Sequence, residues 1–521
     1  MKAEKWKTRI LSALIHAAVF AVCIGALFIL TKLTEPHEKP QGATEAQTEG
    51  TAGEESGGDS EEAGVQDNLP EATASTAEAR EDEAAAPWED TGAGKDESES
   101  EGGQAVRQEE EVPYRPPRII LATDLHYQSH DADDGGKAFQ TFVEECDGKV
   151  VEYLPELLEA FLEEVIQEKP SALVLSGDLT MNGEKMNHEE LADRLRRVRE
   201  SGIPVLVIPG NHDINNTNAA VYIGEEKDQA PAVTAEEFLQ IYYDYGYGQA
   251  FSRDETSLSY AYALDEKNWL LMLDSAQYDP VNLVEGRIQQ STLKWMKGIL
   301  EEAGQRGIFV LPIAHHNLLS QSRMYTTQCT MENHQEVIRL LEEYGCPLFL
   351  SGHLHVQRIH KHKEQPGTPD DAYGIWEIVT DALSIPPCQY GLLQWKEDGS
   401  LEYATKAVDV SAWAAGIGSE NPDLLNFSDW SRNYISSLVS AQIAGKIRNL
   451  GDEVTRSMAE LYAEIYMDYY AGRAIDARTV RSRKGYRWWQ RNLPDSRMLE
   501  QMEAMMTDSN RDNNYFHIAI D

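Results

Sequence analysis

The chain has 521 residues and a formal net charge of −42 at pH 7, with 88 acidic against 46 basic residues. An excess of acidic residues this large argues against stable nucleic-acid binding, because phosphate contacts need clustered Lys and Arg. The length allows about two to four domains of roughly 150 residues each. With 41% hydrophobic residues, most of the chain is expected to fold around a core.

Residues 1–34 combine a basic start with an apolar run over residues 10–30. As a helix this run would be about 31 Å long, the thickness of a bilayer core. The basic flank predicts a single-pass anchor in the cell membrane, with a cytoplasmic N-terminus and an extracytoplasmic chain after Thr31. A cleaved signal peptide is the first alternative, although the run is long for one and no small-x-small site follows it. Lipidation at Cys23 is the second alternative.

Residues 35–112 have a different composition, with 24 acidic residues against 4 basic ones and Trp88 as the single aromatic residue. Such a segment buries too little apolar surface to offset its ordering entropy, so we expect an acidic disordered linker. The remaining residues, 113–521, carry a net charge of −26.

From residue 113 to residue 410 the pattern alternates between buried strands and amphipathic helices. Strands are predicted at residues 118–123, 172–175, 205–208, 269–273, 308–313 and 347–350, and helices at residues 154–166, 191–198 and 337–341. This order predicts an α/β domain with parallel pairing and right-handed crossovers. Asp, Asn or His follows each strand, at the edge of the sheet where ligands gather in open α/β folds.

The residues after these strands form one inventory of carboxylates, imidazoles and a carboxamide, without a thiolate. They are Asp124, His126, Asp178, Asn211, His212, Asp213, His315, His316, His353 and His355. This donor set suits Mn, Fe or Zn. It exceeds the four ligands of one tetrahedral ion and suits two divalent ions about 3.5–4 Å apart. Such a pair would lower the pKa of a bridging water and so supply a hydroxide nucleophile.

The blocks ATDLH, LSGD, PGNHD, AHH and SGHLH occur in this order over about residues 118–360. Together they resemble the calcineurin-like metallophosphoesterase superfamily. The resemblance implies a β-sandwich of two mixed sheets flanked by helices, and an enzyme that hydrolyses phosphoesters with two metal ions.

The resemblance also assigns roles to individual residues. It implies that Asp124, His126 and His355 hold one ion, that Asn211, His315 and His353 hold the other, and that Asp178 bridges the two. His316 is the alternative to His315, although the family usually uses the first histidine of such a pair. His212 would stabilise charge or protonate the leaving oxygen, and Asp213 would orient His212.

The segment GDLTMNGE, followed by His188, resembles extracytoplasmic bacterial phosphodiesterase-like members that act on cyclic nucleotides and carry a helical C-terminal domain. Asn182 and His188 lie where such proteins could contact the phosphate or the sugar. Alternatively, Asn182 and Gly183 form a turn and His188 lies near the start of a helix.

We therefore expect hydrolysis of small phosphodiesters. One alternative is a phosphomonoesterase, or a phosphohydrolase of lipid head groups or wall polymers. A surface-binding protein without catalysis is an alternative of another class.

The last part of the chain starts with a predicted hairpin over residues 392–408 and its turn at Asp398–Gly399. Helices are predicted at residues 430–450, 453–470 and 495–506. We therefore divide the folded region into a catalytic domain over residues 113–410 and a helical domain over residues 411–521 that caps or borders the active site.

Overall fold

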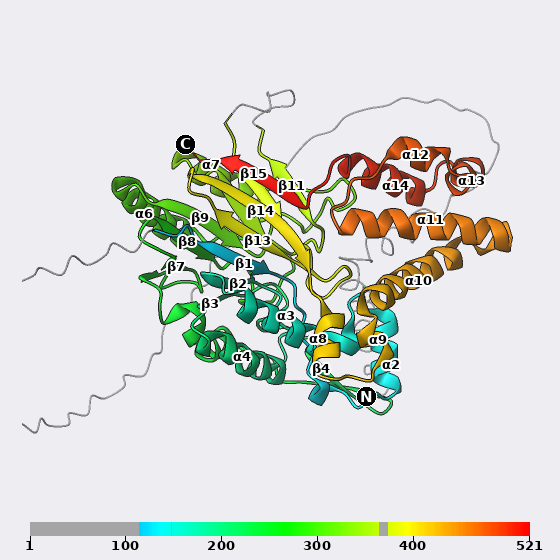
Figure 1. Cartoon of the computed structure of the whole chain (residues 1–521), viewed down its shortest axis with the longest axis horizontal. Helices are drawn as coiled ribbons and strands as arrows, with labels where there is room; N and C mark the ends of the chain where they lie inside the picture. Colours follow the sequence, from blue (N-terminus) through cyan, green and yellow to red (C-terminus); the bar gives the residue numbers. More distant parts are fainter. Residues whose placement is uncertain (1–113, 147, 364–372, 521) are drawn as a thin grey trace, which may run out of the picture. The chain divides into compact units, whose positions relative to one another are not determined.

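The computed structural model describes residues 114–146, 148–363 and 373–520 (Figure 1). The predicted anchor over residues 1–34 and the predicted linker over residues 35–112 lie outside these residues. Within the described ranges, no helix has both the length and the apolar character that a membrane span requires.

The first of two large sheets has six strands in the order β15-β14-β13-β1-β2-β3. Its strands are β1 (Arg118–Ala122), β2 (Ala172–Ser176), β3 (Val205–Ile208), β13 (Gln389–Trp395), β14 (Ser400–Ala407) and β15 (Tyr515–Ala519). β1, β2 and β3 run parallel, whereas β13, β14 and β15 pair antiparallel to their neighbours. The predicted hairpin is therefore confirmed as β13 and β14.

The second sheet has seven strands in the order β11-β12-β10-β9-β8-β7-β6. Its strands are β6 (Ser252–Arg253), β7 (Tyr260–Ala263), β8 (Asn268–Leu273), β9 (Phe309–Ala314), β10 (Leu348–Ser351), β11 (Arg358–Lys361) and β12 (Trp376–Val379). β8, β9, β10 and β12 are parallel. A separate hairpin consists of β4 (Ala220–Ile223) and β5 (Glu226–Gln229).

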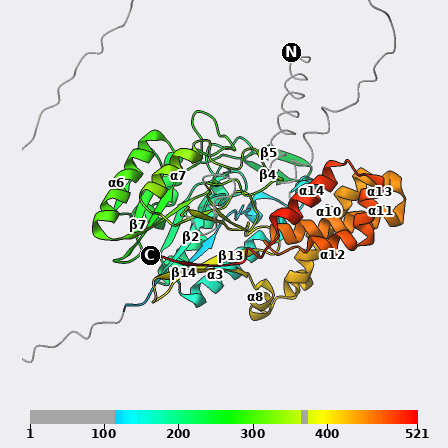
Figure 2. The ribbon, with the colours of Figure 1, turned by 90° about the horizontal axis from the view of Figure 1, so that it is seen from above.

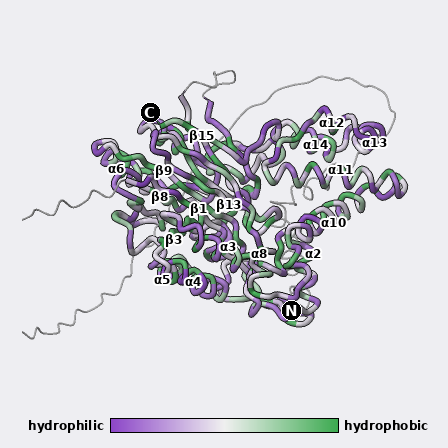
Figure 3. The backbone as a smooth tube through the Cα atoms, viewed as in Figure 1, coloured by the Kyte–Doolittle hydropathy of each residue, from purple (hydrophilic) through white to green (hydrophobic). Residues whose placement is uncertain are grey.

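The main core lies between the two sheets and continues under α3 (Leu154–Glu168) and α4 (Lys185–Glu200). A second core joins β8–β10 to α6 (Gln290–Arg306) and α7 (His334–Glu343), which lie side by side in Figure 2. In Figure 3 the strands carry the most continuous hydrophobic stretches. Helices therefore flank a sandwich of two mixed sheets, which confirms the predicted fold class.

The C-terminal helices are α8 (Val410–Gly416), α9 (Pro422–Leu425), α10 (Phe427–Ile447), α11 (Asp452–Tyr470), α12 (Ala477–Ser482), α13 (Lys484–Asn492) and α14 (Arg497–Asp508). Of these helices, α10 to α14 share a core of their own, whereas α8, α9 and the start of α10 pack on the main core. The core of α10 to α14 also takes in Met324, Tyr325 and Leu354 of the sandwich, so these helices pack beside the loop that contains His353. Tyr469 and Ser322 share a hydrogen bond of 2.6 Å between their hydroxyl groups at this contact.

The predicted helical domain over residues 411–521 also contains a strand that the sequence analysis does not predict. After α14 the chain returns to the six-stranded sheet as β15, where Tyr515 to Ala519 pair with β14. Side chains alternate between half-buried and exposed along β15, as expected for an edge strand. The helical region is therefore an insertion between β14 and β15, two neighbouring strands of one sheet.

Candidate metal centre

The predicted ligands follow five parallel strands of the two sheets. Asp124 follows β1, Asp178 follows β2, Asn211 follows β3, His315 follows β9, and His353 follows β10. Because the carboxyl ends of parallel strands meet at one edge of a sheet, these loops converge. Five residues that are far apart in the sequence therefore reach one buried site.

Five of the predicted ligands have a left-handed backbone conformation. Their φ angles are 53° at Asp124, 44° at His126, 48° at Asp178, 68° at His353 and 54° at His355. Each such conformation costs a non-glycine residue on the order of 1–3 kcal/mol and persists only where surrounding contacts impose it. A concentration of this strain in one place is typical of a functional site.

Glycines beside the ligands allow the loops to approach one another closely. A Cβ atom on Gly210 would collide with the Asp178 carboxylate and with the Asp178 amide nitrogen. A Cβ atom on Gly352 would collide with the Thr123 hydroxyl and would lie 2.7 Å from Asp124 Oδ2. The glycines of the PGNHD and SGHLH blocks therefore have a steric role at the site.

The first cluster contains Asp124, His126, Asp178 and His355, whose ligand atoms all lie within 4.8 Å of one another. His126 Nε2 lies 3.1 Å from His355 Nε2, and His355 Nε2 lies 3.0 Å from Asp124 Oδ1. All four residues are buried. The three residues predicted to hold one ion are thus together, with the predicted bridging carboxylate beside them.

The second cluster is centred on His315 and is joined to the first by Asp178. His315 Nε2 lies 3.3 Å from Asp178 Oδ2 and 3.2 Å from Asn211 Oδ1. The same Asp178 Oδ2 lies 3.8 Å from His126 Nε2, so a single carboxylate oxygen faces both clusters. This is the position that a bridging ligand requires.

Backbone carbonyl groups fix the orientation of two of these imidazoles. His315 Nδ1 lies 3.0 Å from the Ser176 carbonyl, and His353 Nε2 lies 2.8 Å from the Gln328 carbonyl. Because a carbonyl only accepts hydrogen bonds, the facing nitrogen carries the proton and the other nitrogen keeps its lone pair. His315 Nε2 and His353 Nδ1 are therefore the nitrogens available to a metal ion.

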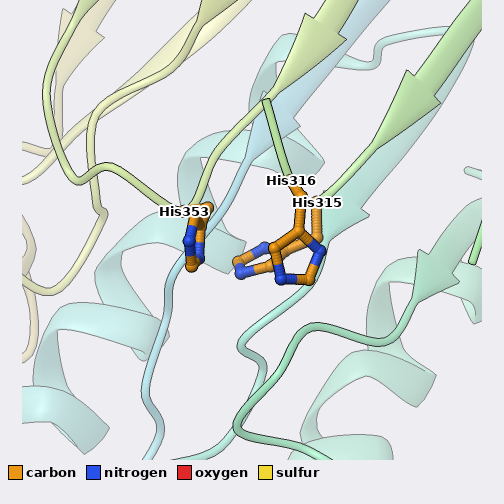
Figure 4. Close-up of side chains that lie close together, drawn as sticks. All are labelled: His315, His316 and His353. Atoms are coloured by element: carbon orange, nitrogen blue, oxygen red, sulfur yellow. The ribbon is translucent and has the colours of Figure 1, made fainter. Parts of the chain in front are cut away.

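The structure favours His315 over His316 as the ligand. His316 lies in the same group as His315 and His353 (Figure 4). However, its Nδ1 lies 2.8 Å from the Ser275 hydroxyl and its Nε2 lies 3.0 Å from the Val284 carbonyl. Both nitrogens of His316 are thus occupied by protein groups, whereas His315 Nε2 points at Asp178 and Asn211.

The electrostatics of the site also fit bound cations. Burial by itself lowers the pKa of His315, but the attraction of Asp178 and Asp124 raises the pKa to about 9. Asp124 is fully buried, and the nitrogen that faces its Oδ1, His355 Nε2 at 3.0 Å, is itself a candidate metal ligand. A buried carboxylate oxygen of this kind needs a compensating positive charge. Two divalent ions would supply it, with the predicted residues as ligands.

His212 stands beside both clusters, with 31% of its side chain exposed. Its Nδ1 lies 2.7 Å from the Met181 carbonyl and 3.2 Å from Asn182 Oδ1, so Nδ1 carries the proton. Its Nε2 lies 4.0 Å from Asp178 Oδ2, on the side of the metal centre. The geometry therefore presents Nε2 to a substrate bound there.

Asp213 does not orient His212 as the sequence analysis predicts. Its carboxylate instead accepts hydrogen bonds from the backbone amides of Leu179, Thr180 and Gly210, at 2.8–3.1 Å. The reason is that the Asp213 carboxylate turns away from the His212 imidazole. Its hydrogen bonds link the PGNHD loop to the LSGD loop. The orienting contacts of His212 come from the carbonyl of Met181 and the side chain of Asn182.

The two predicted substrate residues have different positions. Asn182 is half-buried and contacts His212, so it lies at the edge of the site. His188 is fully buried in α4 and contacts the Tyr242 hydroxyl, the Thr180 hydroxyl and the Asp213 carbonyl, at 2.9–3.0 Å. Both of its ring nitrogens are thus engaged, which corrects the prediction of substrate contact in favour of a packing role near the start of a helix.

The sequence analysis misses Lys149, which is only 4% exposed. The next residue, Val150, donates a hydrogen bond from its amide to the Ser384 carbonyl (2.9 Å), and the Ser384 hydroxyl donates to the Asp124 carbonyl (2.8 Å). The positive charge of Lys149 contributes to lowering the pKa of His126 and of His212, although burial is the larger cause for both. Lys149 belongs to no motif, so the sequence carries no signal that points to it.

Comparison with protein families matches two parts of the chain. Residues 117–357 match the model of the calcineurin-like phosphoesterase family. This part of the chain is a calcineurin-like phosphoesterase domain. Residues 409–512 match the model of the C-terminal domain of cyclic nucleotide phosphodiesterase. With its buried groups of residues that could hold metal ions, the phosphoesterase domain makes the protein a metal-dependent phosphoesterase.

Solved structures similar to this chain include a dimetal phosphatase from Danio rerio, at 14% identity and a TM-score of 0.42. The alignment covers 56% of this chain and 97% of that structure. A purple acid phosphatase from yellow lupin, Lupinus luteus, is 14% identical with a TM-score of 0.37, over 57% of this chain and 52% of the lupin protein. A search of curated proteins found no match.

Proposed function

We propose that the protein is a phosphodiesterase that acts on small, cyclic-nucleotide-like substrates. The observation that carries this proposal is the combination of the two matches, because the phosphoesterase domain is followed by a region similar to the C-terminal domain of cyclic nucleotide phosphodiesterase. The net charge of −26 on residues 113–521 supports a small substrate, since it would repel a long polyanion.

In the proposed reaction, two divalent ions held by the predicted ligands would supply a hydroxide nucleophile and neutralise charge on the phosphoryl group. His212 Nε2 faces the same space and, when protonated, can donate its proton to the leaving oxygen. Met181 and Asn182 hold Nδ1 so that the ring keeps this orientation. Lys149 adds a positive charge that favours an anionic substrate.

The proposal predicts a preference for diesters over monoesters. With a defined metal loading, kcat/KM on bis-(p-nitrophenyl) phosphate should exceed that on p-nitrophenyl phosphate by at least about tenfold, equivalent to about 1.4 kcal/mol in transition-state binding. Both chromogenic substrates release p-nitrophenolate. The ratio of their kcat/KM values therefore depends on whether the phosphate is a diester or a monoester. A clear preference for the monoester would favour the alternative of a phosphomonoesterase.

We also propose that the catalytic domain is held outside the cell by the basic and apolar segment at residues 1–34. The support is the order of charge and hydropathy in that segment. In a bacterial host, the full-length chain should stay with the membrane after extraction at high salt. A protease added to spheroplasts should digest the phosphoesterase domain, and recovery of the chain in the soluble fraction would contradict the proposal.

A further inference from the structure

Glu377 is a fully buried carboxylate that belongs to none of the sequence blocks and to neither group of candidate metal ligands. It lies on β12, where the residues that follow it, Ile378 and Val379, are also buried and are apolar. Burying a carboxylate costs on the order of several kcal/mol, whereas an apolar residue at the same place carries no such cost. A glutamate here therefore needs a reason other than the stability of the sheet.

Both oxygens of Glu377 accept hydrogen bonds. Oε1 accepts from the Leu318 amide and from the Ser351 hydroxyl, each at 2.7 Å. Oε2 accepts from the Leu319 amide at 2.6 Å and from Gln321 Nε2 at 2.7 Å. Burial raises the pKa of Glu377 to about 7, although these four hydrogen bonds act in the opposite direction. Because the donors come from two separate loops, one carboxylate joins the two loops.

The loops joined by Glu377 are the ones that carry His315 and His353. Leu318 follows His315 by three residues, and Ser351 precedes His353 by two. Each histidine therefore lies within three residues of a group that Glu377 holds. His315 and His353 belong to the same group of candidate metal ligands, and their ring centroids are 5.1 Å apart. The distance between the two rings depends on how the loops are held.

Asn317 completes the link between the two loops. Its side-chain amide donates to the Ser351 hydroxyl at 3.0 Å and to the Gly352 carbonyl at 2.8 Å. A hydroxyl group has a single proton, so Ser351 accepts from Asn317 and donates to Glu377. All four residues are buried, so the loss of one hydrogen bond would leave a buried polar group unpaired.

The segment that starts at Asn317 also reaches His353 through its far end. The Gln328 carbonyl accepts a hydrogen bond from His353 Nε2 over 2.8 Å, which leaves Nδ1 for a metal ion. The Met331 amide donates to the Asn317 carbonyl at 3.0 Å and closes the segment into a loop. Glu377 holds the start of this loop and the strand before His353, so it acts on His353 from two sides.

From these contacts we propose that Glu377 is a positioning residue for the metal ion of the second cluster. It holds His315 and His353 at the separation that one ion requires, without contact to the ion or the substrate. The hydrogen bonds of Glu377 end on the loops after β9 and β10, whereas Asp124 and His126 of the first cluster follow β1. The first ion should therefore be affected less than the second. This inference rests on the metal centre and not on the choice between diester and monoester substrates.

The test is calorimetric titration of the full chain with Mn²⁺ after a chelator has removed bound metal. Glu377→Gln keeps the shape of the side chain, but its amide nitrogen cannot accept, so two of the four hydrogen bonds are lost. We expect two binding events in the wild type, of which Glu377→Gln weakens one by at least about tenfold and leaves the other near its wild-type affinity. Titration follows the metal and not turnover, so the result is independent of the diesterase activity proposed above.

Rescue by metal separates positioning from a general loss of structure. At limiting Mn²⁺ the activity of Glu377→Gln on bis-(p-nitrophenyl) phosphate should be low. At saturating Mn²⁺ its kcat should recover to within about tenfold of the wild type, because the weakened site is then filled. A variant that has lost its fold would not recover, and circular dichroism would identify it.

Two further variants complete the test. Asp254→Asn is the matched control, since Asp254 is also buried but accepts from the hydroxyls of Thr292 and Ser257, at 2.5 and 2.7 Å. It should keep both binding events. Ser351→Ala removes one donor to Glu377 and should reproduce the selective loss, which decides the question if Glu377→Gln does not fold. Equal weakening of both events, two unchanged events, or a wild type that binds a single ion would overturn the proposal.

Discussion

Replacement of Asp178 by Asn should lower kcat on bis-(p-nitrophenyl) phosphate by at least about 10³-fold, which corresponds to about 4 kcal/mol. The reason is that Asp178 Oδ2 faces His126 Nε2 at 3.8 Å and His315 Nε2 at 3.3 Å. The amide keeps the shape of the side chain but removes the negative charge that both clusters share. The measurements are steady-state kinetics and metal content by mass spectrometry, and the metal content should fall together with kcat.

Asp274 offers a matched control for this substitution. It also follows a parallel strand, β8, and is buried. However, its carboxylate accepts hydrogen bonds from the Tyr278 hydroxyl at 2.8 Å and from the Leu258 amide at 3.1 Å. Asp274→Asn should therefore retain bound metal and keep kcat within about tenfold of the wild type. If Asp178→Asn kept both its activity and its metal, a surface-binding protein without catalysis would be the better interpretation.

The positions of the candidate metal ligands could be predicted from the sequence, because each candidate follows a strand whose hydrophobic pattern is plain. Once the strands are placed in parallel, the topology brings Asp124 and Asp178, which follow the neighbouring strands β1 and β2, to one edge of the six-stranded sheet. His315 follows β9 of the other sheet, and the packing of the two sheets brings it to the same site. The sequence pattern also predicts the hairpin, since Gly399, with a φ of 81°, supplies its turn. These inferences need only local periodicity and the general properties of α/β sheets.

The contacts around the ligands could not be predicted in this way. The carbonyl groups of Met181 and Gln328 orient His212 and His353, and a backbone carbonyl leaves no signature in the residue type. Asp213 lies next to His212 in the sequence, yet its side chain bonds another loop. Adjacency in a motif thus indicates a shared site without indicating which atoms meet.

The relation between the C-terminal helices and the site also depends on long-range packing. A Cβ atom on Gly148, which has a φ of 87°, would collide with Ile435 of α10. The Tyr434 hydroxyl of the same helix donates a hydrogen bond to the Lys149 carbonyl over 3.4 Å. α10 therefore packs against the loop that carries Lys149, and a helical pattern alone does not specify this contact.

His212→Ala should lower kcat by about 10²–10⁴-fold, the usual contribution of a general acid. Unlike Asp178→Asn, it should leave the metal content unchanged, because Nδ1 bonds Met181 and Nε2 is 4.0 Å from the nearest Asp178 oxygen. The effect should grow as the leaving group becomes more basic, since p-nitrophenolate leaves without a proton. The loss should therefore be larger on diphenyl phosphate than on bis-(p-nitrophenyl) phosphate.

The pH profile separates proton donation from a purely structural role of His212. Burial lowers the pKa of His212 below 6.5, and the nearby positive charge of Lys149 acts in the same direction against the attraction of Asp178. A proton donor is active in its protonated form, so kcat on diphenyl phosphate should fall as the pH rises through this pKa. His212→Ala should remove this fall, whereas Asn182→Ala should retain it and lower kcat by less. An unchanged profile in His212→Ala would show that another group donates the proton.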